Sequence, residues 1–230
     1  MRTRQQLVAL VPALNAAERL PDTLAALAGA VAGVIVADGG STDGTPDLAR
    51  AAGARVVAAP PGRGTQLAAG LAAAEAPWVL VIHADTRPGP GWQAAAETFM
   101  ADPANAERAG YFRFALDDAS PQARRLERMV AWRCRALGLP YGDQGLLIGR
   151  GFLRHLGGYR PIPVMEDVDL VRRIGRARLV ALEAPFVTSA GRWRREGWWR
   201  RSARNLACLS LWFAGVPPGR IARLYARRRG

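Results

Sequence analysis

The feature that most limits the fold of this chain is a series of four short apolar segments, each followed by a stretch with helical character. The four segments are Leu7–Pro12, Gly33–Ala37, Arg55–Ala58 and Trp78–Ile82. Their apolar residues follow one another without regular polar alternation, which is typical of strands buried on both faces of a parallel sheet. Because each segment leads into a helical pattern, residues 7–82 predict repeated β–α units and therefore an α/β fold.

Helix and strand signals continue along the rest of the chain. Asn15 and Glu18 match a capping box and predict a first helix over Ala16–Ala28, and Thr45-Pro46 predicts the start of a second. Further helices are expected at Trp92–Met100, Gln122–Leu137, Glu166–Ile174, Trp198–Ala214 and Pro217–Arg228. Further strands are expected at Ala109–Leu116, Gly145–Gly149 and Leu179–Leu182.

Charge is distributed unevenly between the two ends of the chain. The 230 residues carry a net charge of +13, and every basic residue is Arg, a composition that codon bias also produces. Residues 190–230 contain 11 Arg and one Glu, so this segment alone carries +10. We therefore expect a main domain over residues 1–190 and a basic, Trp- and Arg-rich helical extension over residues 191–230. Such an extension suits an anionic partner, which is a membrane surface, a nucleic acid or a phosphate-bearing substrate.

The remaining composition indicates a globular protein of the cytoplasm. Half of the residues are hydrophobic and 22% are charged, which excludes a disordered chain. The two cysteines, Cys134 and Cys208, lack metal-binding spacing and favour reduced thiols. No apolar stretch reaches the roughly 18 residues that span a bilayer, so membrane contact would be peripheral, on the inner face.

Acidic side chains stand at the predicted ends of two strands. Asp38 follows the second apolar segment and Asp85 follows the fourth, while the Gly-rich loop after the third carries Arg63. In open α/β sheets ligands bind beyond the carboxyl ends of the strands, so these side chains are candidates for one site. Taken singly, either acid is as typical of a turn as of a binding site. Mg²⁺ or Mn²⁺ favours carboxylate oxygen, and His83 is a further candidate ligand.

Six segments occur in the order found in one enzyme family. They are VPALNAAERL, VIVADGGSTDGT, PPGRGTQLAAG, VLVIHADT, YGDQGLLI and VMEDVDLVRR. Together they resemble the inverting glycosyltransferases of family 2, and most closely the bacterial branch known as radical-SAM/selenodomain-associated transferase 2. The resemblance implies a GT-A fold, which is a Rossmann-like, mixed and mostly parallel sheet with helices on both faces. C-terminal amphipathic helices would extend that fold here.

The resemblance also implies which residues bind the nucleotide-sugar. They are Pro12, Asn15, Asp38, Gly40, Arg63, Ala84, Asp85, Asp143 and Gln144. Pro12 and Asn15 would lie near the base and ribose, Asp38 would accept a hydrogen from the base, and Arg63 would lie near the base or diphosphate. Asp85, in a motif similar to Asp-x-Asp, would hold the Mg²⁺ or Mn²⁺ ion.

The catalytic and acceptor residues follow from the same resemblance. Asp167 matches the general base of the family, with Glu166 beside it. Arg192 and Trp193 are candidates for contact with the acceptor or the diphosphate. Two positions depart from the family pattern, because Ala16 follows Asn15 where an acid is usual and His83 replaces the first acid of the metal motif.

The expected activity is transfer of a sugar from a nucleotide-diphosphate sugar, with UDP-sugars favoured, to the hydroxyl group of an acceptor. Lipid-linked molecules are among the expected acceptors. One alternative is a module that binds an anionic membrane or nucleic acid through the basic extension. The other is a nucleotidyltransferase, although its Gly-rich signature contains a lysine and this chain has none. The main domain offers no base-stacking platform, so no nucleic-acid partner is expected. A homo-oligomer remains open.

Overall fold

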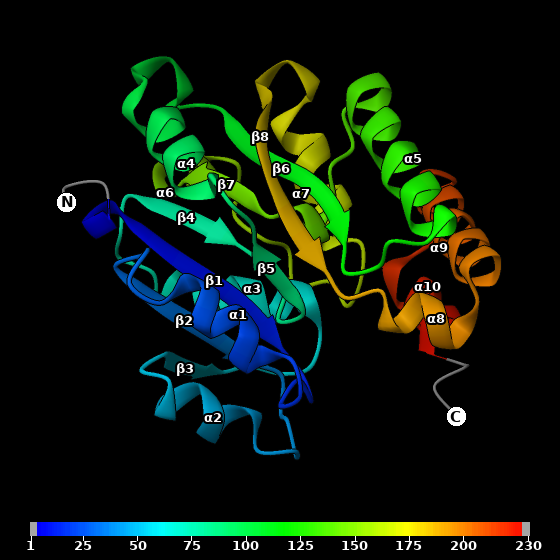
Figure 1. Cartoon of the computed structure of the whole chain (residues 1–230), viewed down its shortest axis with the longest axis horizontal. Helices are drawn as coiled ribbons and strands as arrows, with labels where there is room; N and C mark the ends of the chain where they lie inside the picture. Colours follow the sequence, from blue (N-terminus) through cyan, green and yellow to red (C-terminus); the bar gives the residue numbers. More distant parts are fainter. Residues whose placement is uncertain (1–3, 227–230) are drawn as a thin grey trace.

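A computed structural model of the chain describes residues 4–226 and shows an eight-stranded sheet covered by helices (Figure 1). The strand order is β3-β2-β1-β4-β7-β6-β8-β5. The strands are β1 (Leu7–Ala13), β2 (Gly33–Asp38), β3 (Arg55–Ala58), β4 (Trp78–Val81), β5 (Thr86–Pro88), β6 (Ala109–Leu116), β7 (Leu146–Gly149) and β8 (Leu179–Thr188). Strands β1 to β4 pair in parallel, as do β6 and β8, whereas β7 is antiparallel to β4 and β6, and β5 is antiparallel to β8. The expected α/β fold with a mixed, mostly parallel sheet is confirmed.

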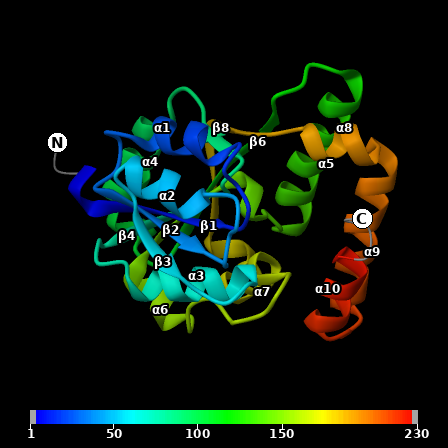
Figure 2. The same cartoon turned by 90° about the horizontal axis from the view of Figure 1, so that it is seen from below.

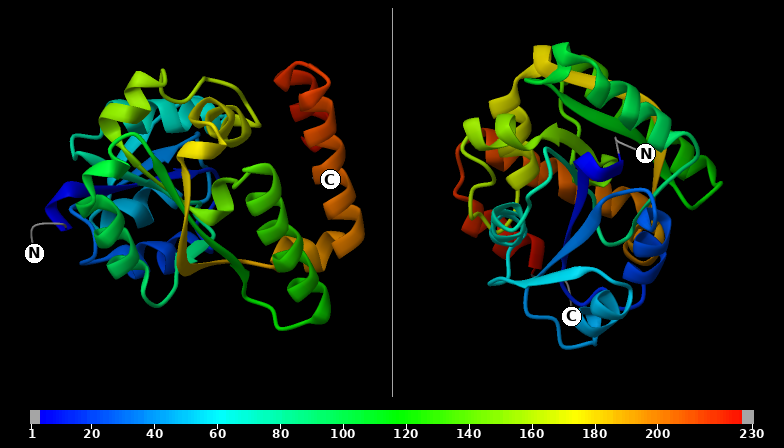
Figure 3. Two further views of the ribbon diagram at one scale, coloured as in Figure 1. Left: turned by 90° about the horizontal axis from the view of Figure 1, so that it is seen from above. Right: turned by 90° about the vertical axis from the view of Figure 1, so that its left-hand side faces the viewer.

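Helices cover both faces of the sheet, and the C-terminal helices lie beyond its strand ends (Figure 1). The helices are α1 (Leu20–Leu27), α2 (Thr45–Ala51), α3 (Arg63–Ala72), α4 (Trp92–Ala101), α5 (Pro121–Leu137), α6 (Arg150–His155), α7 (Glu166–Ile174), α8 (Gly191–Glu196), α9 (Trp198–Phe213) and α10 (Pro218–Ala226). Short 3₁₀ turns lie at η1 (Arg4–Gln6), η2 (Pro103–Asn105), η3 (Gly142–Gln144) and η4 (Arg176–Arg178). Helices α1, α2 and α4 contribute to the core cluster on one face, and α3, α6 and α7 to the cluster on the other (Figure 3).

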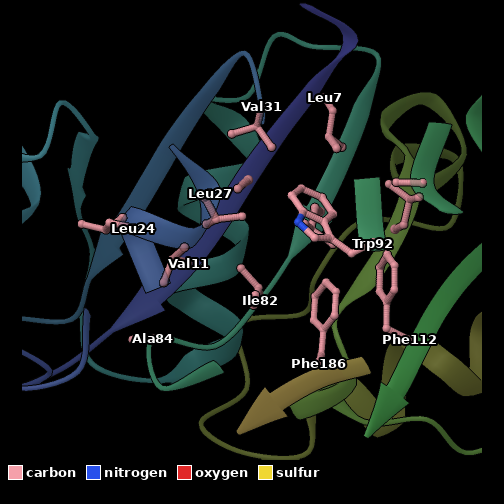
Figure 4. Packing of buried hydrophobic residues seen from close by; sticks show 14 of the residues in the cluster. Leu7, Val11, Leu24, Leu27, Val31, Ile82, Ala84, Trp92, Phe112 and Phe186 are labelled. Atoms are coloured by element: carbon pink, nitrogen blue, oxygen red, sulfur yellow. The ribbon is translucent and has the colours of Figure 1, made fainter. Parts of the chain in front are cut away.

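Aromatic side chains fill the first of these clusters between β6, β8 and α4 (Figure 4). The rings of Phe112 and Phe186 are stacked with centroids 4.0 Å apart, and Trp92 meets Phe186 edge-on at 6.3 Å. Fully burying a side chain of this size contributes about 1.5–3 kcal/mol. This packing fixes β6 and β8 against α4 and so holds the C-terminal part of β8 in position.

Local sequence signals explain the bounds of the long helix α5. The Ser120 hydroxyl accepts the backbone N–H of Ala123 (3.3 Å), and Pro121 occupies the first turn, where its missing N–H leaves no hydrogen bond unmade. The helix ends at Leu137, and the φ of 62° at the following Gly138 lies in the left-handed region. The prediction of this helix is therefore confirmed within a residue of each end.

The predicted start of the first helix is wrong. Helix α1 begins at Leu20, and residues 16–19 form a turn before it. Asn15 does not cap the helix, because its Oδ1 accepts the backbone N–H of Thr42 (2.9 Å) and its φ is 49°. Pro21 then falls in the first turn of α1, where proline is tolerated best.

The last strand is longer than its sequence predicts. The expectation ended at Leu182, but β8 continues through Pro185 to Thr188. Its register against β6 shifts between Phe112 and Arg113, and this irregularity accommodates the proline inside the strand. The extension matters for function because it carries Thr188 to the rim of a cavity.

The C-terminal helices lie beyond the carboxyl ends of β6 and β8 (Figure 1). Helix α9 is the outermost element on this side, with α5 and α10 beside it (Figures 2 and 3). Trp193 of α8 packs with Phe114 and Val130, so residues 191–226 contact the main domain closely. The predicted boundary at residue 190 stays a prediction, and Arg227 and Arg228 lie outside the described residues. Between residues 4 and 226 no helix combines the length and apolar character needed to cross a membrane.

Candidate active site

A cavity of about 220 Å³ opens beyond the carboxyl ends of β4 and β8. Its walls come from the loop after β4, the turn η3, the start of α7 and the helices α8 and α9. Asp85, Asp143 and Asp167 line it together with Arg63 and Arg192. Five residues predicted from separate segments of the sequence therefore meet in one place.

The loop that carries Asp85 is held in position by hydroxyl groups. Thr23 of α1 donates its hydroxyl to the carbonyl oxygens of Ala84 and Thr86, both at 3.0 Å. The Thr86 hydroxyl lies 2.8 Å from that of Thr188, which ties the loop to the end of β8. On the cavity side, Asp85 Oδ2 lies 3.7 Å from a terminal nitrogen of Arg192. Of the neighbours Ala84 and Asp85, Ala84 is buried and Asp85 lines the cavity.

Asp167 stands at the N-terminus of α7 and faces the same cavity. Its Oδ2 accepts the backbone N–H of Gly142 (3.0 Å), and its Oδ1 accepts that of Val168 (2.8 Å). The preceding residue, Met165, has a φ of 66°, a left-handed conformation that costs a non-glycine residue about 1–3 kcal/mol. Such strain persists where the surrounding structure requires it, and here it turns the chain so that helix α7 starts at the cavity wall.

One ion pair joins helix α7 to the loop before it, and a second one lies within the helix. Asp169 Oδ1 accepts from Arg160 and its Oδ2 accepts from Arg173, each with an atom 2.7 Å away. Asp169 is buried, so these charge-assisted bonds also compensate the cost of removing its carboxylate from water. The arrangement anchors residues 160–165 and thereby the position of Asp167.

Glu166 points away from solvent and towards the start of α3. It is 1% exposed, and its Oε1 lies 3.5 Å from Arg63. Burial raises the pKa of Glu166 to about 7, although the Arg63 charge opposes the rise. A Cβ at Gly64 would lie 2.2 Å from the carbonyl oxygen of Arg160, so this position requires glycine. The first turn of α3 and the loop before α7 are thus packed backbone against backbone.

His83 and Asp143 occupy the inner part of the cavity. Burial, followed by the charge of Arg63, lowers the pKa of His83 to about 4, so its ring is neutral at pH 7. Its Nε2 packs against Gly142, where a Cβ would approach within 2.4 Å. Burial raises the pKa of Asp143, whose backbone carbonyl accepts the Thr188 hydroxyl (3.2 Å).

Gln144 lies behind the cavity rather than on its wall. Its Oε1 accepts the backbone N–H of Tyr141 (3.3 Å) and receives the Cys134 thiol at 3.1 Å, while its Nε2 donates to the Phe112 carbonyl (3.1 Å). With both ends of the amide occupied by protein, Gln144 shapes the η3 turn that presents Asp143. The sequence alone did not show that Asp143 lines the cavity while its neighbour Gln144 supports the turn.

The residues predicted to contact the base and ribose gather at the ends of β1 and β2. Asp38 Oδ2 accepts the backbone N–H groups of Gly40 and Ser41, both at 3.0 Å. Asn15 reaches the same loop, since its N–H donates to the Ser41 hydroxyl (2.9 Å). Pro12 is buried in β1 next to this loop. These contacts preform the loop that follows β2.

Gln66 is a site residue that the sequence reasoning missed. It is buried on α3, and its Nε2 donates to the carbonyl oxygens of Ala13 (2.6 Å) and Ala37 (2.9 Å) at the ends of β1 and β2. A Cβ at Gly39 would lie 3.0 Å from its amide, which explains the first glycine after Asp38. A buried glutamine on an otherwise apolar helix face is the signal that would have found it.

The outer wall of the cavity comes from α8 and α9. Trp193 is buried there, as is Arg201, which lies over the Trp193 ring at 4.6 Å and pairs with Glu196 at 2.8 Å. Asn205 of α9 also lines this wall, and Tyr141, next to η3, lines the cavity as well. Arg192 and Trp193 were candidates from the sequence, whereas Arg201 and Asn205 were not, because they lie in an arginine-rich helix whose inward face shows no motif.

A divalent ion would depend on substrate for part of its coordination. Among residues 4–226, no three His, Cys, Asp or Glu side chains lie close enough to hold a metal ion by themselves. Asp85 presents a carboxylate to the cavity, with His83 two residues before it. Mg²⁺ is commonly held by one or two carboxylates together with substrate phosphates, and the chain fits that arrangement.

Residues 8–135, more than half of the chain, match the model of a family described as Glycosyl transferase family 2. The chain belongs to glycosyltransferase family 2. The matched segment includes Asp38, Arg63 and Asp85, whereas Asp143, Asp167 and the C-terminal helices follow it in the sequence.

Curated relatives match this chain over a shorter segment. Uncharacterized glycosyltransferases of Mycobacterium bovis and Mycobacterium tuberculosis are 44% identical to this chain over 77 residues. The match covers 33% of this chain and 35% of those proteins, so the chain matches about a third of their length.

Solved structures show the same fold. A glucosyl-3-phosphoglycerate synthase from Mycobacterium tuberculosis, in complex with Mn²⁺, UDP and glucosyl-3-phosphoglycerate, has a TM-score of 0.58 at 22% identity. The similarity covers 78% of this chain and 70% of that one. Another structure of this synthase gives a TM-score of 0.59 at 24% identity, over 80% and 71% of the two chains. The GT-A fold expected for this glycosyltransferase is thereby shown.

Proposed function

We propose that this family 2 glycosyltransferase moves a sugar from a UDP-sugar to an acceptor hydroxyl, with inversion at the anomeric carbon. The observation that carries the proposal is that Asp85 and Asp167, far apart in the sequence, line one cavity at the carboxyl edge of the sheet. The structural relatives support UDP as the nucleotide, since several contain UDP or UDP-glucose with Mn²⁺. The six ordered segments support membership of the radical-SAM/selenodomain-associated transferase 2 branch.

The nucleotide would lie along the ends of β1 and β2. Asp38 holds the Gly40–Ser41 turn through two backbone N–H groups, and its carboxylate has further lone pairs for a base N–H. Pro12 and Asn15 flank this turn and would contact the base and ribose. Arg63, at the start of α3, lines the cavity, and the diphosphate that connects the nucleotide to the sugar would lie near it.

Asp85 would hold the metal ion, with His83 as a second candidate ligand. The ion would contribute positive charge next to the leaving diphosphate. Arg192 lies 3.7 Å from Asp85 and would add a guanidinium on the same side. Asp143 and Gln144 are expected on the sugar side, with Gln144 acting through the η3 turn.

Asp167 would act as the general base. Its two oxygens are held by the N–H groups of Gly142 and Val168, so the carboxylate is oriented before any substrate binds. It takes the proton of the acceptor hydroxyl as that oxygen forms a bond to the anomeric carbon. The bond from the same carbon to the diphosphate breaks, and UDP leaves with the electron pair. Glu166 would act indirectly, because its carboxyl group holds Arg63.

A thermal-shift titration tests this proposal. UDP and UDP-glucose, with and without Mn²⁺, should raise the melting temperature of the protein, because a ligand that binds only the folded state stabilises it. GDP and GDP-mannose serve as the comparison for base specificity. Asp47→Asn changes an exposed acid of α2 and should leave the nucleotide-induced rise in melting temperature unchanged. It is the control for Asp-to-Asn changes within the site. If no nucleotide raises the melting temperature, the proposal is wrong.

A specific surface also favours peripheral contact with an anionic membrane on the cytoplasmic side. Trp199, Leu206 and Phe213 are exposed on α9 and follow one another at seven-residue spacing, which places them on one face of the helix. Arg200, the residue after Trp199, is exposed as well. A helix with apolar and basic side chains together suits an anionic bilayer, and a lipid-linked acceptor would be presented there.

Vesicle co-sedimentation tests the membrane contact. The protein should sediment with vesicles that contain anionic phosphatidylglycerol and not with neutral phosphatidylcholine vesicles. Leu206→Ser should reduce sedimentation, whereas Leu48→Ser, at an exposed leucine of α2 far from α9, should not (Figure 1). Equal sedimentation of both variants and of the unchanged protein would contradict this assignment.

A further inference from the structure

Asp85, the acid expected to hold the metal ion, already has a cation of the protein next to it. One terminal nitrogen of Arg192 lies 3.7 Å from Asp85 Oδ2. That distance is too long for a hydrogen bond, so the contact is one of electrostatic attraction. The Arg192 side chain is 41% exposed, and ion pairs this close to solvent are weak. The guanidinium therefore balances the charge of Asp85 in a contact that another cation can replace.

The residue two positions before Asp85 adds no negative charge to this place. It is His83, and an imidazole is never an anion in proteins. Its Nε2 packs against Gly142, where a Cβ would approach within 2.4 Å. A single carboxylate next to a single guanidinium has no net charge, so the pair attracts a free divalent ion poorly. The charge of Asp85 becomes available to a metal ion only if Arg192 takes another partner.

The backbone that carries Arg192 is held in place on both sides of the cavity. The Ala190 N–H donates to Asp117 Oδ1 (2.6 Å), and the Ser189 N–H donates to the backbone carbonyl of Asp85 (3.1 Å). The side chain of Arg192 nevertheless lines the cavity and reaches solvent. A change of partner therefore needs only a rotation of this long side chain, and helix α8 stays where it is.

A complex of Mn²⁺ and UDP offers new partners to both charges of the pair. Asp85 gains a divalent cation, and Arg192 gains the diphosphate, a group that guanidinium binds well. With free Mn²⁺ alone, Asp85 has a partner but Arg192 faces a second cation. With free UDP alone, Arg192 has a partner but Asp85 faces an anion. Each ligand by itself is thus opposed by one member of the pair, and the two together by neither.

We propose that Arg192 is the counter-ion of Asp85 in the free protein and passes to the diphosphate when metal and nucleotide bind together. The proposal rests on the proposed transferase function, since it concerns the donor side of the same site. Arg192 thereby makes metal binding depend on the nucleotide, and by reciprocity nucleotide binding depends on the metal to the same extent. It is a specificity-determining residue that favours the metal–nucleotide complex over the free metal ion.

Electron paramagnetic resonance of Mn²⁺, whose free aqueous ion gives a sharp signal, tests the proposal without any sugar transfer. In titrations without nucleotide, Arg192→Gln should bind Mn²⁺ about fivefold more tightly than the unchanged protein, because the competing cation is gone. At saturating Mn²⁺, calorimetric titration should show UDP binding about tenfold more weakly to the same variant, because the diphosphate has lost its guanidinium. A merely structural role of Arg192 would weaken both.

The matched control is Arg194→Gln. Arg194 is exposed on the same helix and pairs with Asp118 at 3.3 Å, so this change removes the same charge and should leave both affinities unchanged. Arg192→Lys keeps the charge and should bind free Mn²⁺ as weakly as the unchanged protein. Adding Asp85→Asn to Arg192→Gln should abolish the gain in Mn²⁺ affinity, since that gain needs the carboxylate.

Binding of free Mn²⁺ to Arg192→Gln that is unchanged or weaker would overturn the proposal. A gain that survives Asp85→Asn, or that also appears in Arg194→Gln, would overturn it as well. These outcomes leave the transferase function standing as long as UDP with Mn²⁺ binds the unchanged protein. If UDP binds the unchanged protein at no Mn²⁺ concentration, the transferase function is refuted, and the proposal with it.

Discussion

Replacing Glu166 by Gln should make the stability of the protein less dependent on pH. Glu166 is 1% exposed, and burial raises its pKa from the ordinary 4.5 to about 7. Below pH 4.5 both the folded and the unfolded chain hold the proton, and nothing is lost. As the pH rises, the unfolded chain gives up its proton first, so the free energy of unfolding falls until the pH passes the folded-state pKa.

The size of this effect follows from the shift. At about 1.36 kcal/mol per unit, the rise from 4.5 to about 7 corresponds to a total loss of roughly 3.4 kcal/mol. About 2.5 kcal/mol of that loss falls between pH 5 and pH 8. Glutamine has a similar shape and no proton to lose, so the Glu166→Gln variant should not show this part of the decline.

Urea unfolding at pH 5, 6, 7 and 8 measures the difference. The free energy of unfolding of Glu166→Gln, relative to the unchanged protein, should increase by about 2.5 kcal/mol across this range. Glu97→Gln, at an exposed position of α4, is the matched control, and its difference should stay constant. Parallel pH dependence of Glu166→Gln and the unchanged protein would refute the reasoning, because it would mean that the buried carboxyl group ionises normally in the folded state.

Three further substitutions test the way the site is held together. Gly64→Ala would place a Cβ 2.2 Å from the Arg160 carbonyl oxygen, so it should cost about 1–3 kcal/mol in urea unfolding and weaken UDP binding by moving Arg63. Gln66→Glu removes the two hydrogen bonds donated to the ends of β1 and β2, so the free energy of unfolding should fall by about 2–4 kcal/mol in the same assay. An unchanged urea midpoint would contradict a stabilising role for these two hydrogen bonds. Asp85→Asn should leave the melting temperature of the free protein nearly unchanged but remove most of the extra stabilisation that Mn²⁺ adds to UDP, as read by thermal shift.

Much of the fold was predictable because its signals are local. The buried strands of the first half are continuous apolar runs, and α5 carries its cap, its first-turn proline and its terminal glycine in the sequence. The start of α1 was mispredicted because Asn15 bonds to Thr42, which is distant in the sequence. The length of β8 was underestimated because Pro185 looks like a strand end until the register shift with β6 is known.

The site was predictable to a similar extent and for a similar reason. Asp85 and Asp167 lie in motifs that are readable from the sequence, and the structure places both on one cavity. Gln66 and Asn205 lie in no motif. Gln66 meets the end of β1, and Asn205 meets the cavity, only after α3 and α9 have packed. The difference between Glu166 and Asp167 also required the structure, since only burial and the Arg63 contact separate the two adjacent acids.

The central claim is a single displacement at the anomeric carbon with Asp167 as the base, and the configuration of the product tests it most directly. Proton NMR of the reaction with UDP-α-glucose and an acceptor alcohol should show a new β-linked anomeric signal. Asp167→Asn should abolish that signal while UDP still raises the melting temperature, because the variant keeps the fold and loses only the proton acceptor. An α-linked product, or full activity in Asp167→Asn, would contradict the account.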